Sequence, residues 1–250
     1  MKISTQAILL FVFLFGLLGC NKNIQQLNPI ENRVLNKAEY FHGGAERFRS
    51  IQNITYTKRF TLYLEDGTEE KTFTQYHDYD FDKEAYKIKT LTGNDTFVLT
   101  SYQGQITKLK NGSSTNTTAS KLLKELNTSL YVFRIPFNLR DPGVQLDLLD
   151  TDQEGKNTFH VLSAIYNPDK HSNHSTSDRW FFRISEDSGE IISNKIYSSD
   201  HKSWVDNLSW HEVDGMRFYH HRKSYRLDQD DQKTYLRAEY WYEDFKINAN

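Results

Sequence analysis

Few residues of this sequence have the spacing of a catalytic or metal site. His171 and His174 lie three positions apart in the polar stretch 167–177. With His201 or His211 close in space, they could hold a zinc ion, which accepts imidazole nitrogens as ligands. No second ligand pair with a recognised spacing accompanies them. A solvated loop is therefore the favoured interpretation, and we expect no metal site.

The acidic run 228–231, followed by Glu239, has some of the carboxylates of a calcium-binding loop. Lys233 stands where such a loop requires glycine, and the surrounding pattern predicts strands, so an acidic hairpin turn is the better interpretation. The sequence has no nucleophile elbow, phosphate-binding loop or dinucleotide fingerprint. Carboxylates of a glycosidase can lie far apart in a chain, which keeps a hydrolase as an alternative. Our prediction is a protein that is not an enzyme and needs no cofactor.

The only cysteine, Cys20, follows a basic start at Lys2 and an apolar run from Ile8 to Leu18. This order is typical of a secretory signal peptide, and the run is too short to cross a hydrocarbon layer of ~30 Å. The segment 17–20 (LLGC) resembles the lipobox of bacterial lipoproteins. The resemblance implies a signal peptide over 1–19, acylation of Cys20 as the membrane anchor, and a tether over 20–28. In lipoproteins of this kind, Asp directly after the acylated cysteine retains the protein at the inner membrane. Asn21 occupies that position here, so the resemblance implies the outer membrane of a Gram-negative cell.

The composition of the remaining chain favours one β-rich domain. Removal of 1–19 leaves 231 residues, enough for one large domain over 29–250. The formal charge of the whole chain is −2, and no dense basic run is present, so nucleic acid is not an expected partner. The 16 Phe, 15 Tyr and 4 Trp favour pleated, half-buried surfaces. A lone cysteine cannot form an internal disulfide.

Helices are predicted at two places. Asn28 can cap a helix whose first position is Pro29, and Glu31 completes a capping box. Apolar residues at helical spacing extend this helix to about His42, and a short turn or second helix follows through Ser50. A second apolar stripe predicts a helix over about 122–133.

Alternating patterns predict antiparallel strands on both sides of the second helix. Asp66-Gly67 and Asp214-Gly215 are hairpin turns, and Asp141-Pro142-Gly143 is a type II turn. The links are too short for crossover helices, so neighbouring strands should be antiparallel. The predicted strands are 52–64, 71–80, 85–92, 96–102, 104–110, 156–166, 178–185, 191–197, 208–213, 216–225 and 233–245.

The order of these elements resembles the LolA/LolB-type fold, an incomplete antiparallel β-barrel covered by two or three helices. The resemblance is carried by 40–48 (YFHGGAERF), 131–139 (YVFRIPFNL), 141–144 (DPGV) and 180–184 (WFFRI), which are similar to segments of a family of bacterial lipoproteins with this fold. The family supplies no catalytic residues to transfer. LolA carriers are not lipidated whereas LolB receptors are, so Cys20 favours a membrane-anchored acceptor or binder.

An open barrel of this kind has an apolar concave face that helices must cover, and a gap beneath them would hold a lipid or acyl chain. Core packing is the ordinary role of each aromatic residue on that face. The alternative function is an envelope module with a filled core that binds a protein or glycan. The residues expected along a hydrophobic cavity are Phe60, Leu62, Phe97, Phe133 and Phe182.

Overall fold

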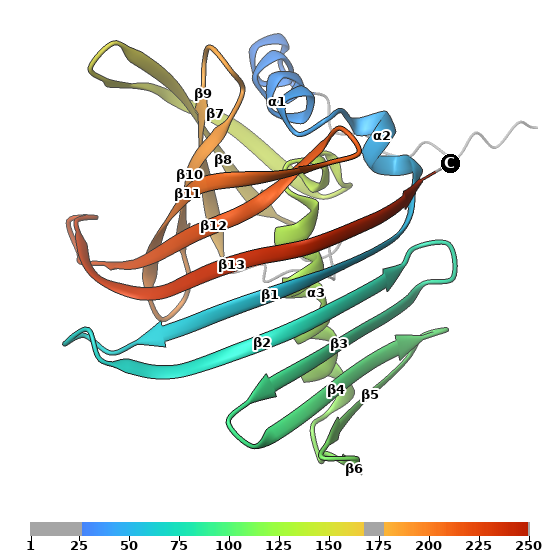
Figure 1. Cartoon of the computed structure of the whole chain (residues 1–250). Helices are drawn as coiled ribbons and strands as arrows, with labels where there is room; N and C mark the ends of the chain where they lie inside the picture. Colours follow the sequence, from blue (N-terminus) through green and yellow to red (C-terminus); the bar gives the residue numbers. More distant parts are fainter. Residues whose placement is uncertain (1–26, 168–177, 250) are drawn as a thin grey trace, which may run out of the picture.

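The computed structural model describes residues 27–167 and 178–249, so Cys20, His171 and His174 lie outside the described residues. Figure 1 shows the order and arrangement of the elements. Their bounds are α1 Pro29–Phe41, α2 Ala45–Ser50, β1 Ile51–Tyr63, β2 Glu69–Asp80, β3 Ala85–Thr92, β4 Asp95–Tyr102, β5 Gln105–Lys110, β6 Ser113–Ser114, α3 Ala119–Arg134, the 3-10 helix η1 Phe137–Arg140, β7 Val144–Glu154, β8 Asn157–Tyr166, β9 Arg179–Ser185, β10 Ile191–Tyr197, β11 Lys202–Val213, β12 Met216–Leu227 and β13 Lys233–Ala249.

All described strands belong to one antiparallel sheet. Their order is β6-β5-β4-β3-β2-β1-β13-β12-β11-β10-β9-β8-β7, so the first long strand pairs with the last. In this central pair, Phe60 lies opposite Tyr240 and Leu62 opposite Ala238. The edge strands β6 and β7 do not pair with each other, and the sheet stays open. The expected incomplete antiparallel barrel is therefore confirmed.

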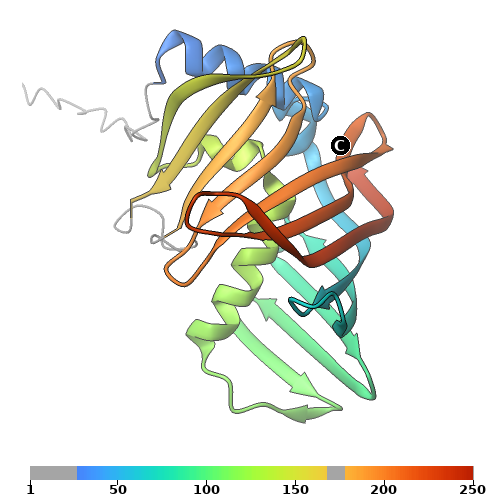
Figure 2. The same cartoon turned by 90° about the vertical axis from the view of Figure 1, so that its left-hand side faces the viewer.

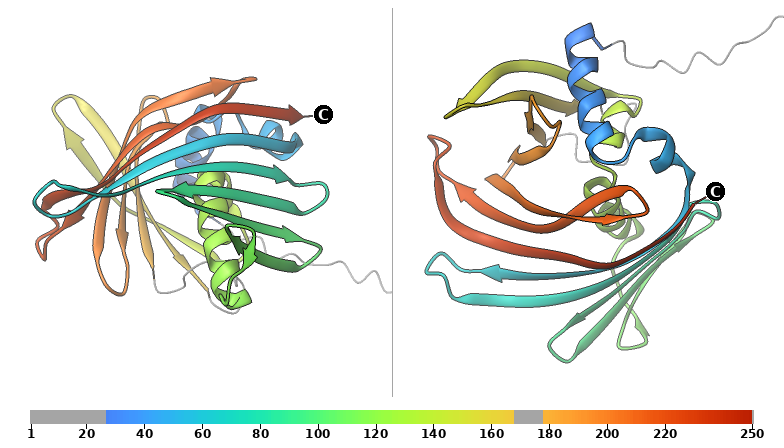
Figure 3. Two further views of the ribbon diagram at one scale, coloured as in Figure 1. Left: turned by 60° about the horizontal axis from the view of Figure 1, so that its bottom comes forward. Right: turned by 45° about the horizontal axis from the view of Figure 1, so that its top comes forward.

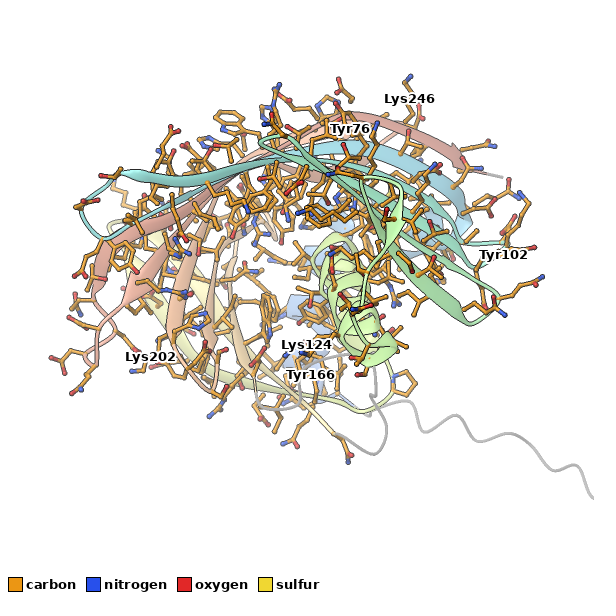
Figure 4. All side chains as sticks on the ribbon, turned by 90° about the horizontal axis from the view of Figure 1, so that it is seen from below. Tyr76, Tyr102, Lys124, Tyr166, Lys202 and Lys246 are labelled. Atoms are coloured by element: carbon orange, nitrogen blue, oxygen red, sulfur yellow. The ribbon has the colours of Figure 1, made fainter. Side chains whose placement is uncertain are left out.

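Helix α3 lies against the concave face of the sheet, as Figures 2 and 3 show from different sides. It buries Leu122, Leu126 and Tyr131. Leu122 and Leu126 belong to the apolar stripe that the helical spacing predicts, whereas Leu123 of that stripe is exposed. Lys108 on β5 forms an ion pair with Glu125 at 2.6 Å and joins the exposed part of α3 to the sheet. Figure 4 shows side chains filling much of the space between helix and sheet, whereas Tyr76 lies on the convex side.

Helix α1 begins as predicted. The side chain of Asn28 accepts hydrogen bonds from the backbone N–H of Ile30 and Glu31, and the Glu31 carboxylate accepts from the N–H of Asn28 at 3.1 Å. The other Glu31 oxygen accepts from the N–H of Leu148, which ties the helix start to β7. Along α1, a Cβ at Gly189 would lie 2.3 Å from the carbonyl oxygen of Lys37, so the β9–β10 turn approaches the helix backbone closely.

The centre of the core is a group of aromatic rings shared by sheet and helix. Phe133 of α3 stacks on Phe218 at a centroid distance of 5.5 Å and on Tyr56 at 6.0 Å. Phe245 stacks on Phe218 at 4.9 Å and on Tyr56 at 5.2 Å. These contacts hold the C-terminal half of α3 over β1, β12 and β13.

Two long strands differ most from the sequence prediction. The segment 144–154 is not among the predicted strands but forms β7, an edge strand whose second half is exposed and contains Asp150 and Asp152. Aspartate is depleted in strands, although charge on an edge protects it from pairing with other chains. Strand β11 begins at Lys202, whereas the prediction began it at 208. The prediction missed this start because Ser203 and Asn207 occupy buried positions where a strand usually has apolar residues.

None of the helices in the described part of the chain is both apolar enough and long enough to cross a membrane.

Candidate functional site

A cavity of about 390 Å³ lies between α3 and the concave face of the sheet. Binding sites for small ligands generally measure roughly 300–1,000 Å³, so this cavity is large enough for one such ligand. Its walls come from α3, from β1 and β2, and from β9 to β13. The lining residues are Tyr56, Lys58, Leu62, His77, Thr128, Ser129, Val132, Phe133, Trp180, Ile196, His201, Ser203, Val205, Arg222, Ser224, Arg226, Arg237, Ala238, Tyr240 and Tyr242.

The structure brings only part of the expected cavity set together. Leu62 and Phe133 line the cavity. Phe60 stacks on Phe73 of the neighbouring strand at 4.5 Å. Phe97 lies near the other end of α3, with the ammonium group of Lys108 over its ring.

Phe182, the remaining residue of that set, is fully buried and stacks on Trp180, which itself lines the cavity. Alternation within a strand predicts which residues share one face of the sheet. It does not determine which of them α3 covers, because that depends on where the helix crosses the sheet.

One side of the cavity is apolar. Trp180, Ile196 and Val205 come from three adjacent strands and line the cavity together with Val132 of α3. Thr128 and Ser129 make the helix surface there small and only weakly polar. A surface of this kind favours an aliphatic chain, because the burial of apolar groups contributes about 25 cal/mol per Å².

The floor of the cavity carries positive charge. Arg222, Arg226 and Lys58 line it, and none of the described lining residues is Asp or Glu. The side chain of Arg222 is buried, with 4% of its surface exposed. Its Nε donates to Oδ1 of Asn207 at 2.8 Å, and its guanidinium lies 4.2 Å from the ring centroid of Tyr219.

Tyr240 lies at the middle of this charged floor. Burial raises the pKa of its hydroxyl to about 12, and the charge of Tyr242 acts in the same direction. The positive charges of Arg222, Arg226 and Arg237 oppose the rise in the pKa. The Nζ atom of Lys58 is 5.2 Å from the Tyr240 ring centroid. These side chains therefore share one neighbourhood although they come from three strands.

His77 closes the cavity towards β2. It stacks on Tyr56 at 4.3 Å, and its Nδ1 lies 2.7 Å from the hydroxyl oxygen of Tyr79. Burial lowers the pKa of His77 well below its ordinary value, and the charge of Lys58 lowers it further. Its Nε2 is buried and has no hydrogen-bond partner within the described structure. The imidazole is therefore neutral at pH 7.

Sequence reasoning missed the cationic floor. A signal existed, because Arg222, Ser224 and Arg226 alternate along β12 on the face that also carries buried Phe218. Charged residues at inward positions of a strand are uncommon without a partner or a function. Among residues 27–167 and 178–249, no three His, Cys, Asp or Glu side chains are close enough to hold a metal ion.

An open antiparallel half-barrel with a helix across its concave face and a cavity beneath that helix defines a LolA-like fold. Solved structures with a similar fold include the following two. A DUF1329 family protein from Desulfovibrio piger ATCC 29098 has 9% identity and a TM-score of 0.53, with 87% of this chain and 92% of that chain covered. An outer-membrane lipoprotein-sorting protein domain from Vibrio parahaemolyticus has 8% identity and a TM-score of 0.50, with 86% and 92% covered.

A LolA superfamily protein from Nitrosomonas europaea aligns over 88% of this chain and 94% of its own, with 10% identity and a TM-score of 0.48. No family model matches the sequence, and no curated protein matches it. The similarity to solved structures therefore concerns the fold, and the chemistry has to be argued from the cavity of this chain.

Proposed function

We propose that this chain is a membrane-anchored lipoprotein of the bacterial cell envelope that binds a hydrophobic ligand, a lipid or an acyl chain, in the cavity beneath α3. The observation that carries the proposal is the cavity itself, about 390 Å³ with an apolar wall of Trp180, Ile196 and Val205. The alternative function, an envelope module with a filled core, does not require such a cavity.

Two further observations support the proposal. The lipobox-like segment ending at Cys20 supplies an anchor, and Asn21 after it favours the outer membrane. The similar domain from Vibrio parahaemolyticus is described as sorting outer-membrane lipoproteins, which are acylated proteins. We propose a role in binding rather than catalysis, because the lining residues that the structure describes include no carboxylate pair and no nucleophile hydrogen-bonded to a base.

Native mass spectrometry of the chain from Asn21 onward tests the binding role. The truncated chain keeps every element that the structure describes. We expect a co-purifying lipid or fatty acid, released by organic extraction. Ala238→Phe adds a ring inside the cavity and should weaken binding about tenfold or more, because the ring occupies the ligand's space.

The matched control is Thr61→Phe, which adds the same ring on the opposite face of the neighbouring strand. Thr61 lies beside Leu62, the residue paired with Ala238. The control should bind like the wild type, and circular dichroism should show that both variants fold. A wild-type chain that stays free of ligand after lipid is added would contradict the proposed function.

A further inference from the structure

We infer that the ligand is an anionic amphiphile with a single acyl chain, whose negatively charged oxygens are bound by Arg222, Arg226 and Lys58 on the cavity floor. This inference rests on the proposed function and specifies the chemistry of its ligand. The acyl chain would lie along the apolar wall formed by Trp180 and Val205.

Arg222 supplies the main argument. Its guanidinium is buried, and within the described part of the chain it has no carboxylate partner; its polar contact is with the amide oxygen of Asn207. A buried charge without a counter-ion is costly, and proteins normally pair it. The cavity beside Arg222 gives an incoming anion access to the remaining N–H groups of the guanidinium.

The position of Arg222 is fixed before any ligand arrives. The amide nitrogen of Asn207 donates to the carbonyl oxygen of Ile191 at 2.7 Å and to Oδ1 of Asn194 at 3.1 Å, which leaves the Asn207 oxygen free to accept from Arg222. Tyr219 supports the flat face of the guanidinium. A group held in this way loses little entropy on binding, which favours affinity.

Two more cations complete the floor without acidic partners among the described residues. Nη1 of Arg226 donates to the hydroxyl of Ser203 at 3.0 Å. Lys58 lies over the rings of Phe60 and Tyr240, at 4.9 and 5.2 Å from their centroids. Lys58 on β1 lies opposite Tyr242 of β13, and Arg222 on β12 lies opposite Tyr240 of the same strand, so β13 separates the two charges.

Basic residues next to this floor, by contrast, have acidic partners. Arg59, next to Lys58 but on the convex face, forms an ion pair with Glu243. Lys223, next to Arg222, lies 3.5 Å from Glu239. Arg237 at the edge of the cavity forms an ion pair with Glu70, so we leave it out of the anion site.

The chemistry of the site is common to carboxylates and phosphates. A guanidinium presents parallel N–H groups that match either anion, and charge-assisted hydrogen bonds of this kind are stronger than neutral ones. A fatty acid and a single-chain phospholipid are therefore two sources of the same group. The cavity volume of about 390 Å³ favours one chain over several.

Equilibrium binding to the chain from Asn21 onward tests the inference with three probes that share one alkyl chain: palmitate, hexadecyl phosphate and hexadecanol. We expect at least one anionic probe to bind roughly tenfold or more tightly than the neutral alcohol, since each charge-assisted hydrogen bond is worth about that factor. The ratio of palmitate to hexadecyl phosphate identifies the preferred headgroup.

Variants identify the residues responsible. Arg222→Gln and Lys58→Gln should each reduce the preference for the anionic probe several-fold and leave hexadecanol binding unchanged. The neighbours on the opposite face supply matched controls, Lys223→Gln and Arg59→Gln, which should retain the preference. Lys58 is partly exposed and has no hydrogen bond to a described residue, so its variant stays informative if Arg222→Gln does not fold.

The outcomes separate this inference from the proposed function. If all three probes bind equally and the Arg222 and Lys58 variants bind like the wild type, the anion site is wrong while the lipid-binding role stands. If none of the probes binds and no lipid co-purifies, the proposed function fails together with the inference.

Discussion

His42 provides a quantitative prediction about stability and pH. The residue follows α1, has only 2% of its surface exposed, and its Nδ1–H donates to the carbonyl oxygen of Arg217 at 3.0 Å. Its Nε2 is buried and has no partner within the described structure. Burial lowers the pKa of His42 from 6.5 to about 4, the Arg217 hydrogen bond opposes this shift, and the Arg217 charge adds to it.

The sign of the pH effect follows from proton binding in the two states. Below pH 6.5 the unfolded chain binds a proton at this histidine, whereas the folded chain stays neutral until about pH 4. The free energy of unfolding should therefore fall by about 1.4 kcal/mol per pH unit in this window. The contribution of the neutral His42 to the free energy of unfolding is fully present above pH 6.5. By pH 4, the free energy of unfolding has fallen by about 3 kcal/mol through this residue.

His42→Asn keeps an N–H donor for the Arg217 carbonyl and removes the titration. We expect its unfolding free energy to be lower at neutral pH, by about 2 kcal/mol, because the ring leaves a void. Its dependence on pH should be less steep than that of the wild type. Urea unfolding at a series of pH values from neutral to about 4 measures both quantities.

Leu35→Ala is the control, because it removes a fully buried side chain that does not titrate. It should lower stability by about 2–5 kcal/mol with a pH dependence parallel to that of the wild type. If His42→Asn also runs parallel to the wild type, the buried, neutral imidazole is not the cause of the acid sensitivity and the reasoning is wrong.

Three other predictions concern the fold and the anchor. Glu31→Ala removes the acceptor for both the N-cap and the Leu148 N–H, so urea unfolding should show a loss of about 1–2 kcal/mol; an unchanged midpoint would contradict the assigned contacts. Gly189→Ala should lower the free energy of unfolding by more than about 2 kcal/mol, because φ is +79° and the new Cβ would collide with the Lys37 backbone. A melting temperature equal to that of the wild type would contradict this close approach. Cys20→Ser should move the protein from the membrane to the soluble fraction, because acylation requires the thiol; membrane retention of the variant would refute the anchor.

The sequence was informative where local chemistry determines structure. The Asn28 cap and the turn at Asp141-Pro142-Gly143 are found where the residue types predict them, the latter with the N–H of Val144 donating to the Asp141 carbonyl. Helix α3 also forms where the apolar spacing predicts a helix. Each of these features depends on neighbours within a few positions of the chain.

Features that depend on distant contacts were harder to predict. The start of β11 was missed, because buried Asn207 satisfies its polar groups through Ile191, Asn194 and Arg222 rather than through a hydrophobic pattern. The cationic floor was missed for the same reason, since residues of β1 and β12 meet only after β13 is inserted between them. Which residues of the concave face line the cavity depends on where α3 crosses the sheet. No local sequence pattern predicts that crossing point.

The most direct test of the central claim locates the ligand within the folded chain. A fatty acid with a spin label on its chain should broaden the backbone NMR signals of residues around the cavity, such as Val132 on α3 and Val205 on β11. Signals from Tyr76 on the convex face should stay sharp. Broadening confined to the convex face, or none at saturating ligand, would contradict the account that this cavity is a lipid-binding site.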